Sequence, residues 1–413
     1  MLFEMWLGHP LIQADNTIGL LGVMCISVAL SIWLEQKYNW ASKLSSAIIA
    51  LILAMGMANI GIIPIHCALY DDVVWGIVVP VGLPLLLLQC NMKKIWKNIG
   101  HMLAIFLIGA VGTVVGAFLA YFLLRGPFGD APGLAGVAAM MTGSYIGGGV
   151  NFAAMAAQFN NQYTASATVA DNLLMALYFF VLIAFAGMRL FRKNFNHPHI
   201  DAVEAGVSKE AAQTQAAAFW CRKDISLMDI ALNVAYAVGV VWLAQIIAGF
   251  FTGLVPEDPN VFMDFVGKFF GSQYVWITTI SVIVATFFTS TVEKMNGSQE
   301  IGTYLISLFM FVIGVPANIY TVVTEAPLLL VFTFIMVVVN MLFCFGGAKI
   351  FKFNLEDAII ASNANIGGPT TAAGMAISQG WAALVGPAML CGVLGYVIGN
   401  YLGTIVGIVL HAG

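Results

Sequence analysis

One carboxylic acid lies inside an apolar stretch of this chain, and it is the clearest candidate for chemistry in the sequence. Asp171, followed by Asn172, sits about eight residues into an apolar segment expected at residues 163–188. A carboxylate at membrane depth is costly and usually faces a cavity, a partner or an ion path. We therefore expect Asp171 and Asn172 to take part in ion coupling, by binding Na⁺ or carrying a proton. The alternative is a helix that begins later and leaves Asp171 near the interface as a cap.

A short polar, glycine-rich phrase occurs twice, 220 positions apart. The copies cover residues 142–156 and 362–376, and 6 of 11 positions are identical between 146–156 and 366–376. Hydrocarbon tolerates irregular backbone only where protein or a cavity shields it. Two interruptions at matching positions in two halves of a chain indicate a transporter's binding site. The alternative is that the small residues only allow helices to pack closely.

Both phrases carry groups suited to binding a solute. Half-helix N-termini suit anionic groups, and loosened carbonyls suit cations. Glycines permit tight turns and close approach by a ligand. The expected solute-binding residues are Ser144, Tyr145, Gly147, Gly148, Asn151, Asn363, Asn365, Gly367, Gly368, Thr370 and Thr371. Asn340, in a later apolar segment, is a further candidate for ion coupling, with structural helix–helix hydrogen bonding as the alternative.

The composition places these features in a membrane. Of the 413 residues, 61% are hydrophobic and 9% are charged, whereas a soluble chain carries about 25% charged residues. A bilayer-spanning helix takes about 20 apolar residues. The expected long segments are 16–36, 43–64, 73–92, 101–124, 163–188, 225–253, 274–292, 301–323, 327–348 and 381–410. With the glycine-rich segments 133–159 and 356–379, they predict an all-α integral membrane protein of 10 to 12 membrane segments.

The positions of Lys and Arg predict how these segments are oriented, because cytoplasmic loops carry an excess of them. If both glycine-rich segments fold back as hairpins, 14 of the 16 basic residues lie on one side, leaving only Arg125 and Lys268 on the other. This gives two inverted repeats, residues 1–188 and 225–413, joined by a cytoplasmic linker at 189–224. If both glycine-rich segments crossed the membrane fully, one additional crossing near the linker would also place most basic residues on one side. The linker is too polar to favour such a crossing.

Other classes of function have less support. No nucleotide-binding phrase is present, and the scattered cysteines and histidines give no metal-ligand spacing, so we expect no metal and no cofactor besides Na⁺ or H⁺. An intramembrane enzyme would need a catalytic pair, whereas one deep acid stands alone, and so we expect no enzyme. A channel is not favoured, because a channel usually has a symmetric ring of filter elements and this chain is a two-fold pseudo-repeat. The expected partners are a small-molecule solute and the lipid bilayer, with no nucleic acid; a homodimer is left open.

The same motifs carry a resemblance to a known family. The chain resembles domain-of-unknown-function family 819 of bacterial integral membrane proteins at T-G-S-Y-I-G-G-G-V-N-F (142–152), A-D-N (170–172), A-S-N-A-N-I-G-G-P-T-T-A (361–372) and G-V-L-G-Y-V-I-G-N-Y-L-G (392–403). The resemblance implies a multi-pass protein of the bacterial cytoplasmic membrane and no particular substrate. More distantly, the glycine pairs are similar to those of ion-coupled carriers for citrate, glutamate and bile acids. Those carriers imply an elevator mechanism, and the bile-acid type implies broken helices that cross fully.

These observations predict a secondary active transporter. It would be coupled to Na⁺ or H⁺ and would move a small polar or anionic solute by elevator-type alternating access. The alternative is a cation/proton antiporter in which Asp171 is the exchange site.

Overall fold

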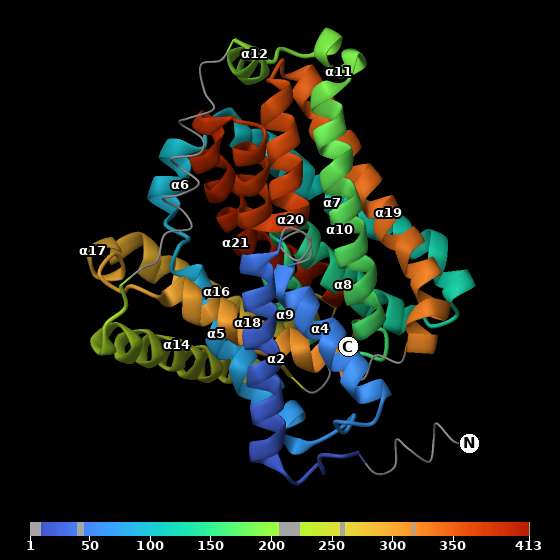
Figure 1. Ribbon diagram of the computed structural model, residues 1–413, viewed down its shortest axis with the longest axis vertical. Helices are drawn as coiled ribbons and strands as arrows, with labels where there is room; N and C mark the ends of the chain where they lie inside the picture. The colour runs from blue at the N-terminus through green and yellow to red at the C-terminus, as the bar shows by residue number, and fades with distance from the viewer. Residues whose placement is uncertain (1–9, 39–44, 206–223, 257–260, 316–318, 413) are drawn as a thin grey trace.

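The computed structural model describes residues 10–38, 45–205, 224–256, 261–315 and 319–412, and every regular element in these ranges is a helix (Figure 1). The helices that match the expected long segments are α2 (Thr17–Lys37), α4 (Ser45–Asn59), η1 (Leu69–Val78) with α5 (Val79–Leu87), α7 (His101–Phe128), α10 (Thr164–Gly187), α14 (Leu227–Gly253), α16 (Gln273–Phe287), α18 (Ser298–Gly314), α19 (Ile319–Ile350) and α21 (Val385–Val409). Within the described ranges, seven helical spans are long and apolar enough to cross a membrane. The predicted all-α membrane architecture is therefore confirmed.

Short helices connect the long ones. They are α6 (Met92–Asn98), α11 (Arg189–Asn194), α12 (Pro198–Glu204), α15 (Val261–Phe270), α17 (Thr289–Val292) and η2 (Ala382–Leu384). Side-chain caps fix several helix starts by accepting a hydrogen bond from the first free N–H groups. Asn91 caps α6, and Ser226 with Asp229 forms a capping box at α14. The predicted linker thus contains α11 and α12, while its residues 206–223 lie outside the described ranges.

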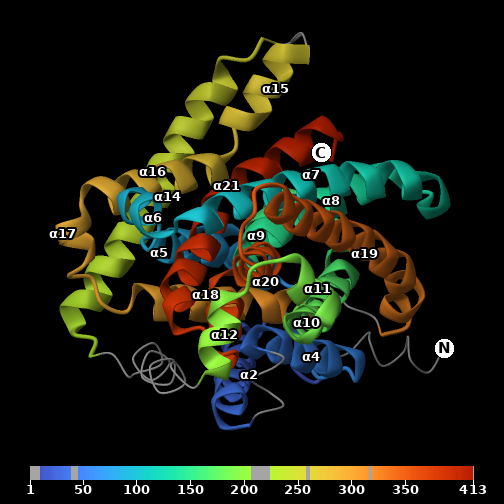
Figure 2. The ribbon, with the colours of Figure 1, turned by 90° about the horizontal axis from the view of Figure 1, so that it is seen from above.

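The long helices form two groups, which we call the hairpin bundle and the flanking bundle. The hairpin bundle contains α7, α10, α19, α21 and the two glycine-rich segments, and the flanking bundle contains α2, α4, η1, α5, α14, α16 and α18. Helices pack extensively within each bundle, and between the bundles most contacts involve α21, α9, α16 and α5 (Figure 2). The two bundles therefore contact each other much less than the helices within each bundle do.

The first glycine-rich segment is a helical hairpin. Its arms are α8 (Ala131–Gly147) and α9 (Gly149–Gln158), and Gly148 forms the turn with φ 79° and ψ −171°. Gly143 of the outgoing arm packs against Met155 of the returning arm, and Gly136 packs against Phe159. Residues so far apart in sequence touch only because the chain reverses direction at Gly148.

The second glycine-rich segment, α20 (Leu355–Ser378), reverses in the same way. Gly368 has φ 78° and ψ −169°, nearly the conformation of Gly148. The Asn363 side chain donates to the Thr371 carbonyl at 3.1 Å and contacts the Met375 sulfur at 3.5 Å. An unbroken helix would separate residues 363 and 375 by about 18 Å at 1.5 Å per residue. The full crossing implied by the bile-acid-type carriers is therefore wrong for both segments.

The two hairpins open at opposite ends of α7. Near its start, His101 stacks on Phe353, two residues before α20, with ring centroids 5.2 Å apart. At its end, Phe128 contacts Tyr163, between α9 and α10, with centroids 4.6 Å apart. The hairpins therefore approach each other from opposite ends of one long helix. The two inverted repeats and their bounds stay a prediction.

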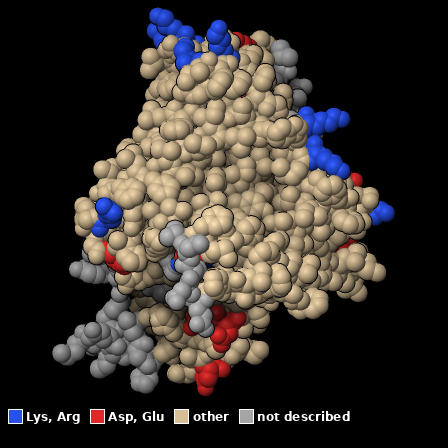
Figure 3. Space-filling view, turned by 180° about the vertical axis from the view of Figure 1, so that it is seen from behind, with Lys and Arg blue, Asp and Glu red and all other residues tan. Residues whose placement is uncertain are grey.

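Basic residues are concentrated at the His101 end. At that end the Asn91 side chain at the start of α6 donates to the Thr289 hydroxyl of α17. The Leu355 N–H at the start of α20 donates to the Asn196 carbonyl, which follows α11. The basic residues in helix termini and loops there are Lys93, Lys94, Lys97, Arg189, Arg192, Lys193, Lys294, Lys349 and Lys352. In the described ranges the opposite end carries Arg125 and Lys268. The cytoplasmic location of this end, which the positive-inside rule indicates, stays a prediction. Figure 3 shows a wide uncharged surface with charged side chains at its margins.

Candidate functional site

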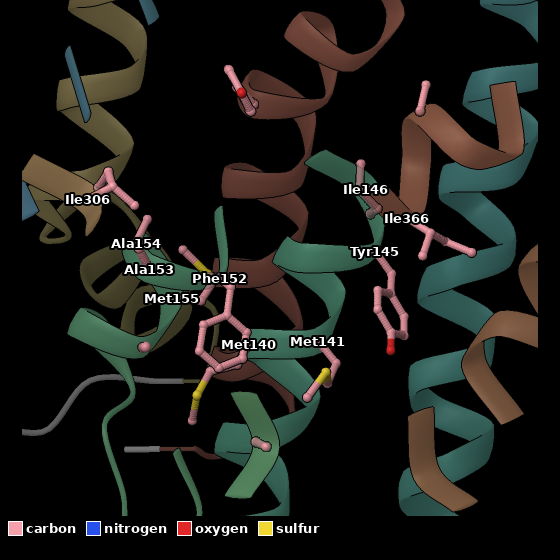
Figure 4. Packing of buried hydrophobic residues seen from close by; sticks show 14 of the residues in the cluster. Met140, Met141, Tyr145, Ile146, Phe152, Ala153, Ala154, Met155, Ile306 and Ile366 are labelled. Atoms are coloured by element: carbon pink, nitrogen blue, oxygen red, sulfur yellow. The ribbon is translucent and has the colours of Figure 1, made fainter. Parts of the chain in front are cut away.

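The turns of the two hairpins meet in the middle of the hairpin bundle. Gly148 packs against the backbone of Gly367 and Gly368, and Gly368 packs against Gly147. Figure 4 shows Tyr145 and Ile146 of the first turn close to Ile366 of the second. Positive φ values at Gly148 and Gly368 fall in a region that favours glycine. The repeated phrase therefore builds one contact from two distant segments.

Helix α21 supports both turns with a glycine surface. A Cβ at Gly395 would lie 2.2 Å from the Ile146 carbonyl oxygen, and one at Gly392 would lie 2.3 Å from the Pro369 nitrogen. Both distances are shorter than any real contact of a side chain with backbone. The glycines therefore allow close helix packing, which the sequence indicated as the alternative to a binding site.

Asp171 lies on the buried face of α10, beside the first turn. Helix α10 begins at Thr164, so Asp171 is inside the helix and is not a cap. Its side chain is 4% exposed, and its Oδ2 accepts a hydrogen bond of 2.8 Å from the Ser144 hydroxyl. Its Oδ1 has no hydrogen-bond partner, and no Lys, Arg or His of the described residues forms an ion pair with it. A buried carboxylate of this kind requires a compensating proton or cation.

Tyr145 completes a small polar cluster with Asp171. Its hydroxyl lies near the Asp171 carboxylate and the Thr333 hydroxyl but makes no well-formed hydrogen bond to either. Its backbone carbonyl accepts a 2.9 Å hydrogen bond from Thr113 of α7. We call Ser144, Tyr145, Asp171 and Thr333 the tip site. Its oxygens are the ligand type that hard cations such as Na⁺ prefer, and its unpaired carboxylate oxygen can also hold a proton.

A second polar network joins four helices and contains Asn340. The Asn340 amide nitrogen donates to the Gly109 carbonyl at 2.9 Å and to Thr113 at 3.0 Å, and its oxygen accepts from Ser362 at 2.9 Å. Ser362 also bonds to Tyr178 of α10 at 2.7 Å. Because these bonds use both ends of the amide, the geometry favours helix–helix bonding for Asn340. A role in ion coupling stays a prediction.

The other predicted amides mostly hold the hairpins in place. Asn151 donates to the Gly395 carbonyl at 2.8 Å, and Asn365 donates to the carbonyls of Phe106 and Ala361 at 3.2 and 3.0 Å. Asn172 is half-buried and bonds to the Thr168 carbonyl at 2.8 Å. Contact of these residues with a solute stays a prediction.

The two predicted threonines differ in exposure. Thr371 donates to the Gly368 carbonyl at 3.1 Å and so closes the second turn. Thr370 is exposed. A solute could therefore reach Thr370 without displacing a hydrogen bond of the hairpin, and its role in binding also stays a prediction.

Sequence reasoning missed Thr113, Tyr178 and Thr333. Two signals were available. Thr113 and Thr333 are 220 positions apart, the same offset as the repeated phrases, and Tyr178 follows Asp171 by seven residues, which is two helical turns. The position 220 residues after Asp171 is Cys391, so the acid has no counterpart in the second half. In the part of the chain that the structure describes, no cluster of His, Cys, Asp and Glu could hold a metal ion.

Comparison with known proteins agrees with this architecture. The family model described as "Protein of unknown function (DUF819)" matches residues 22–412. The chain is also 44% identical over 402 residues to a Bacillus subtilis (strain 168) protein named "Uncharacterized membrane protein YjcL", with 97% of this chain and 98% of the relative covered. The predicted resemblance to a family of integral membrane proteins is therefore confirmed.

Proposed function

Since the chain belongs to the DUF819 family and is a multi-pass integral membrane protein, we propose that it is a secondary active transporter driven by Na⁺ or H⁺. The solute would be small and polar or anionic. One observation carries the proposal: a buried carboxylate without a counter-ion, Asp171, is bonded to the turn at which two opposed hairpins meet. We place the protein in the bacterial cytoplasmic membrane, with the His101 end inside.

The ion would act through the cost of burying charge. An isolated carboxylate is expensive in a low-dielectric interior unless a proton or cation neutralises it. Bound Na⁺ would contact the carboxylate of Asp171 and the hydroxyls of Ser144 and Tyr145. Occupancy of the tip site would then decide which arrangement of the hairpin bundle is favoured, as a ligand shifts a two-state equilibrium.

The two-bundle architecture supports an elevator mechanism. The hairpin bundle carries the tip site, and its boundary with the flanking bundle is thin. A movement of one bundle along the other would expose the meeting point of the turns first to one side of the membrane and then to the other. The hairpins open in opposite directions, which suits access from both sides.

Transport by purified protein in proteoliposomes tests this proposal. Asp171→Asn should abolish ion-driven solute uptake, because a neutral amide cannot exchange a proton or balance a cation. Asp264→Asn is a suitable control, since Asp264 is a partly exposed acid paired with Lys268 at 3.4 Å on α15. Wild-type uptake by Asp171→Asn protein that folds normally would overturn the proposal.

A cation/proton antiporter is the second candidate, and the unpaired Oδ1 of Asp171 favours it. In that case Asp171 would bind H⁺ and Na⁺ alternately. Proteoliposomes separate the two functions: an antiporter moves protons when Na⁺ is added without any organic solute, whereas a symporter requires the solute. We propose transport rather than catalysis because the tip site has one carboxylate and no second acid or base.

A further inference from the structure

A second group of buried polar atoms lies outside the tip site, where α21 meets the flanking bundle. We propose that this group, Tyr236, Thr278, Ser281 and Asn400, binds an uncharged, hydrogen-bonding solute such as a polyol or a carboxamide. This inference rests on the proposed transport function and names its solute class. We call these four residues the interface cluster.

The interface cluster is formed by three helices. The Asn400 amide of α21 donates to the Thr278 hydroxyl of α16, and Thr278 donates to the Tyr274 carbonyl at 2.9 Å. Ser281 follows Thr278 by one helical turn on the same buried face. The Tyr236 hydroxyl of α14 faces the Ser281 hydroxyl without a well-formed hydrogen bond, and Cys90 is an electrostatic neighbour of Tyr236.

The end of α5 closes the cluster. Cys90 contacts the Val393 carbonyl of α21 at 3.3 Å and is an electrostatic neighbour of Tyr396. Cys90 therefore neighbours both α14 and α21.

Three polar atoms of this cluster are buried without a hydrogen-bond partner. They are the Asn400 Oδ1, the Ser281 hydroxyl and the Tyr236 hydroxyl. Asn400 is 2% exposed and Ser281 is fully buried. Buried polar groups are nearly always paired, so each exception calls for an explanation. The Tyr236 and Ser281 hydroxyls face each other without a well-formed hydrogen bond, and the Asn400 oxygen has no partner. A ligand that pairs with these groups would explain all three exceptions together.

The chemistry of the three atoms specifies the solute. Asn400 Oδ1 accepts hydrogen bonds only, and the two hydroxyls both donate and accept. The solute therefore needs at least one O–H or N–H donor and nearby acceptor oxygens. None of the four residues is charged, and neither is any hydrogen-bond partner described for them, so nothing there compensates an ionic solute. Burying an unpaired charge at such a site is unfavourable.

The position of the cluster links it to the tip site. Gly399, the neighbour of Asn400, packs against the Asn151 side chain and the Gly143 carbonyl of the first hairpin. Helix α21 thus contacts the hairpin that carries Ser144 on one side and the solute groups of α14 and α16 on the other. A solute bound here touches both bundles, and it would be released when they shift past each other.

Thermal unfolding of the full chain in detergent micelles tests the assignment. Glycerol, xylitol and acetamide serve as neutral probes, citrate and glutamate as anionic probes, and choline as a cationic probe. All are used at low millimolar concentration, where general osmolyte stabilisation is weak. At least one neutral probe should raise the melting temperature saturably. Ser281→Ala and Tyr236→Phe should raise the half-saturating concentration at least several-fold.

Matched controls keep the test specific. Ser307→Ala removes a buried hydroxyl of α18 that bonds to the Thr303 carbonyl, and Tyr274→Phe removes a buried tyrosine hydroxyl of α16. Both should bind the neutral probe as wild type does. Saturable stabilisation by the charged probes alone, no saturable response to any neutral probe, or an unchanged response in both cluster variants would each overturn the assignment.

A separate measurement covers variants that fold poorly. In vesicles, a Ser281→Cys variant that keeps Cys90 and lacks the other native cysteines should react with neutral methyl methanethiosulfonate faster than the same background with Ser281, and the stabilising probe should slow this reaction. Unprotected labelling or no labelling would contradict the assignment. If uptake still depends on Asp171 in such a case, the solute assignment fails while the transport function stands.

Discussion

Ser144 and Asp171, on different helices and 27 positions apart, are joined by a hydrogen bond of 2.8 Å in a fully buried environment. This bond ties the turn of the first hairpin to the acid that we assign to ion coupling. Movement of either group changes the surroundings of the other, so the turn and the acid form one structural unit.

Ser144→Ala should weaken Na⁺ binding without abolishing it, because it removes one of the proposed ligand oxygens. The variant also removes the one hydrogen bond described for the Asp171 carboxylate, and a bond to a charged group contributes about 1.5–3 kcal/mol. For Na⁺ coupling the ion concentration for half-maximal uptake should therefore rise at least about tenfold, whereas for H⁺ coupling the required proton concentration should fall, because the hydroxyl stabilises the charged carboxylate. Flux measured against ion concentration checks this. Ser378→Ala, which removes a comparable bond to the Met375 carbonyl in the second hairpin, should leave that value unchanged.

Gly148→Ala should destabilise the protein far more than Gly149→Ala. Gly148 has φ 79° and its Cβ would lie 3.1 Å from the Gly367 oxygen, whereas nothing lies within 4 Å of a Cβ at Gly149. A residue held in such a region costs about 1–3 kcal/mol. Thermal unfolding in detergent should show a clear loss for the first variant only. Equal melting temperatures would mean that the turn does not need glycine.

Asn340→Leu tests whether this amide is structural or ion-binding. The variant leaves the Gly109 carbonyl and the Ser362 hydroxyl with fewer partners, at a cost of about 1–3 kcal/mol for each buried group. We expect a lower melting temperature and an unchanged ion requirement in the protein that folds. Asn172→Ala, which removes one bond to the Thr168 carbonyl, serves as the milder comparison. A shifted ion requirement with normal stability would restore the ion-coupling role.

Glu356 should hold the linker against the second hairpin. Its Oε1 accepts hydrogen bonds of 2.8 Å from the N–H groups of both His199 and Ile200, at the start of α12. Glu356→Ala should release α12 and speed tryptic cleavage at Lys193. Glu293→Ala removes an exposed acid paired with Lys94 and should leave cleavage at its wild-type rate. Unchanged cleavage in the Glu356 variant would show that other contacts hold the linker.

Cysteine labelling of intact cells checks the orientation. Cysteines at Ala205 and Met295 should react only after the membrane is permeabilised, because both positions belong to the basic His101 end. A cysteine at Asn160, beside the opening of the first hairpin, should react from outside. Labelling of position 205 from outside would invert the orientation assigned by the basic residues.

Periodicity and charge were enough to predict the helices and the reversal of the two glycine-rich segments. Long apolar runs define α7 and α21, and the distribution of Lys and Arg indicated that residues 133–159 fold back. Side-chain partners were harder to predict, because they come from helices whose rotation about their own axes the sequence does not specify. Asn340 looked equally suited to an ion or to a neighbouring helix until its bonds to Gly109 and Ser362 were known.

The interface cluster shows the same limit more strongly. Tyr236, Ser281 and Asn400 belong to three helices and share no sequence motif. Each is an ordinary residue for a membrane helix when considered alone. That all three lack a well-formed hydrogen bond becomes visible only when the helices are packed.

The glycine surface of α21 has a consequence for communication across the membrane. Gly392 and Gly395 are one helical turn apart, about 4.5 Å along the axis, and each contacts a different hairpin. A small rotation of α21 therefore alters the surroundings of both turns at the same moment. In the proposed transporter, a single helix would therefore move both hairpins together, which would disfavour any state in which both sides of the membrane are open at once.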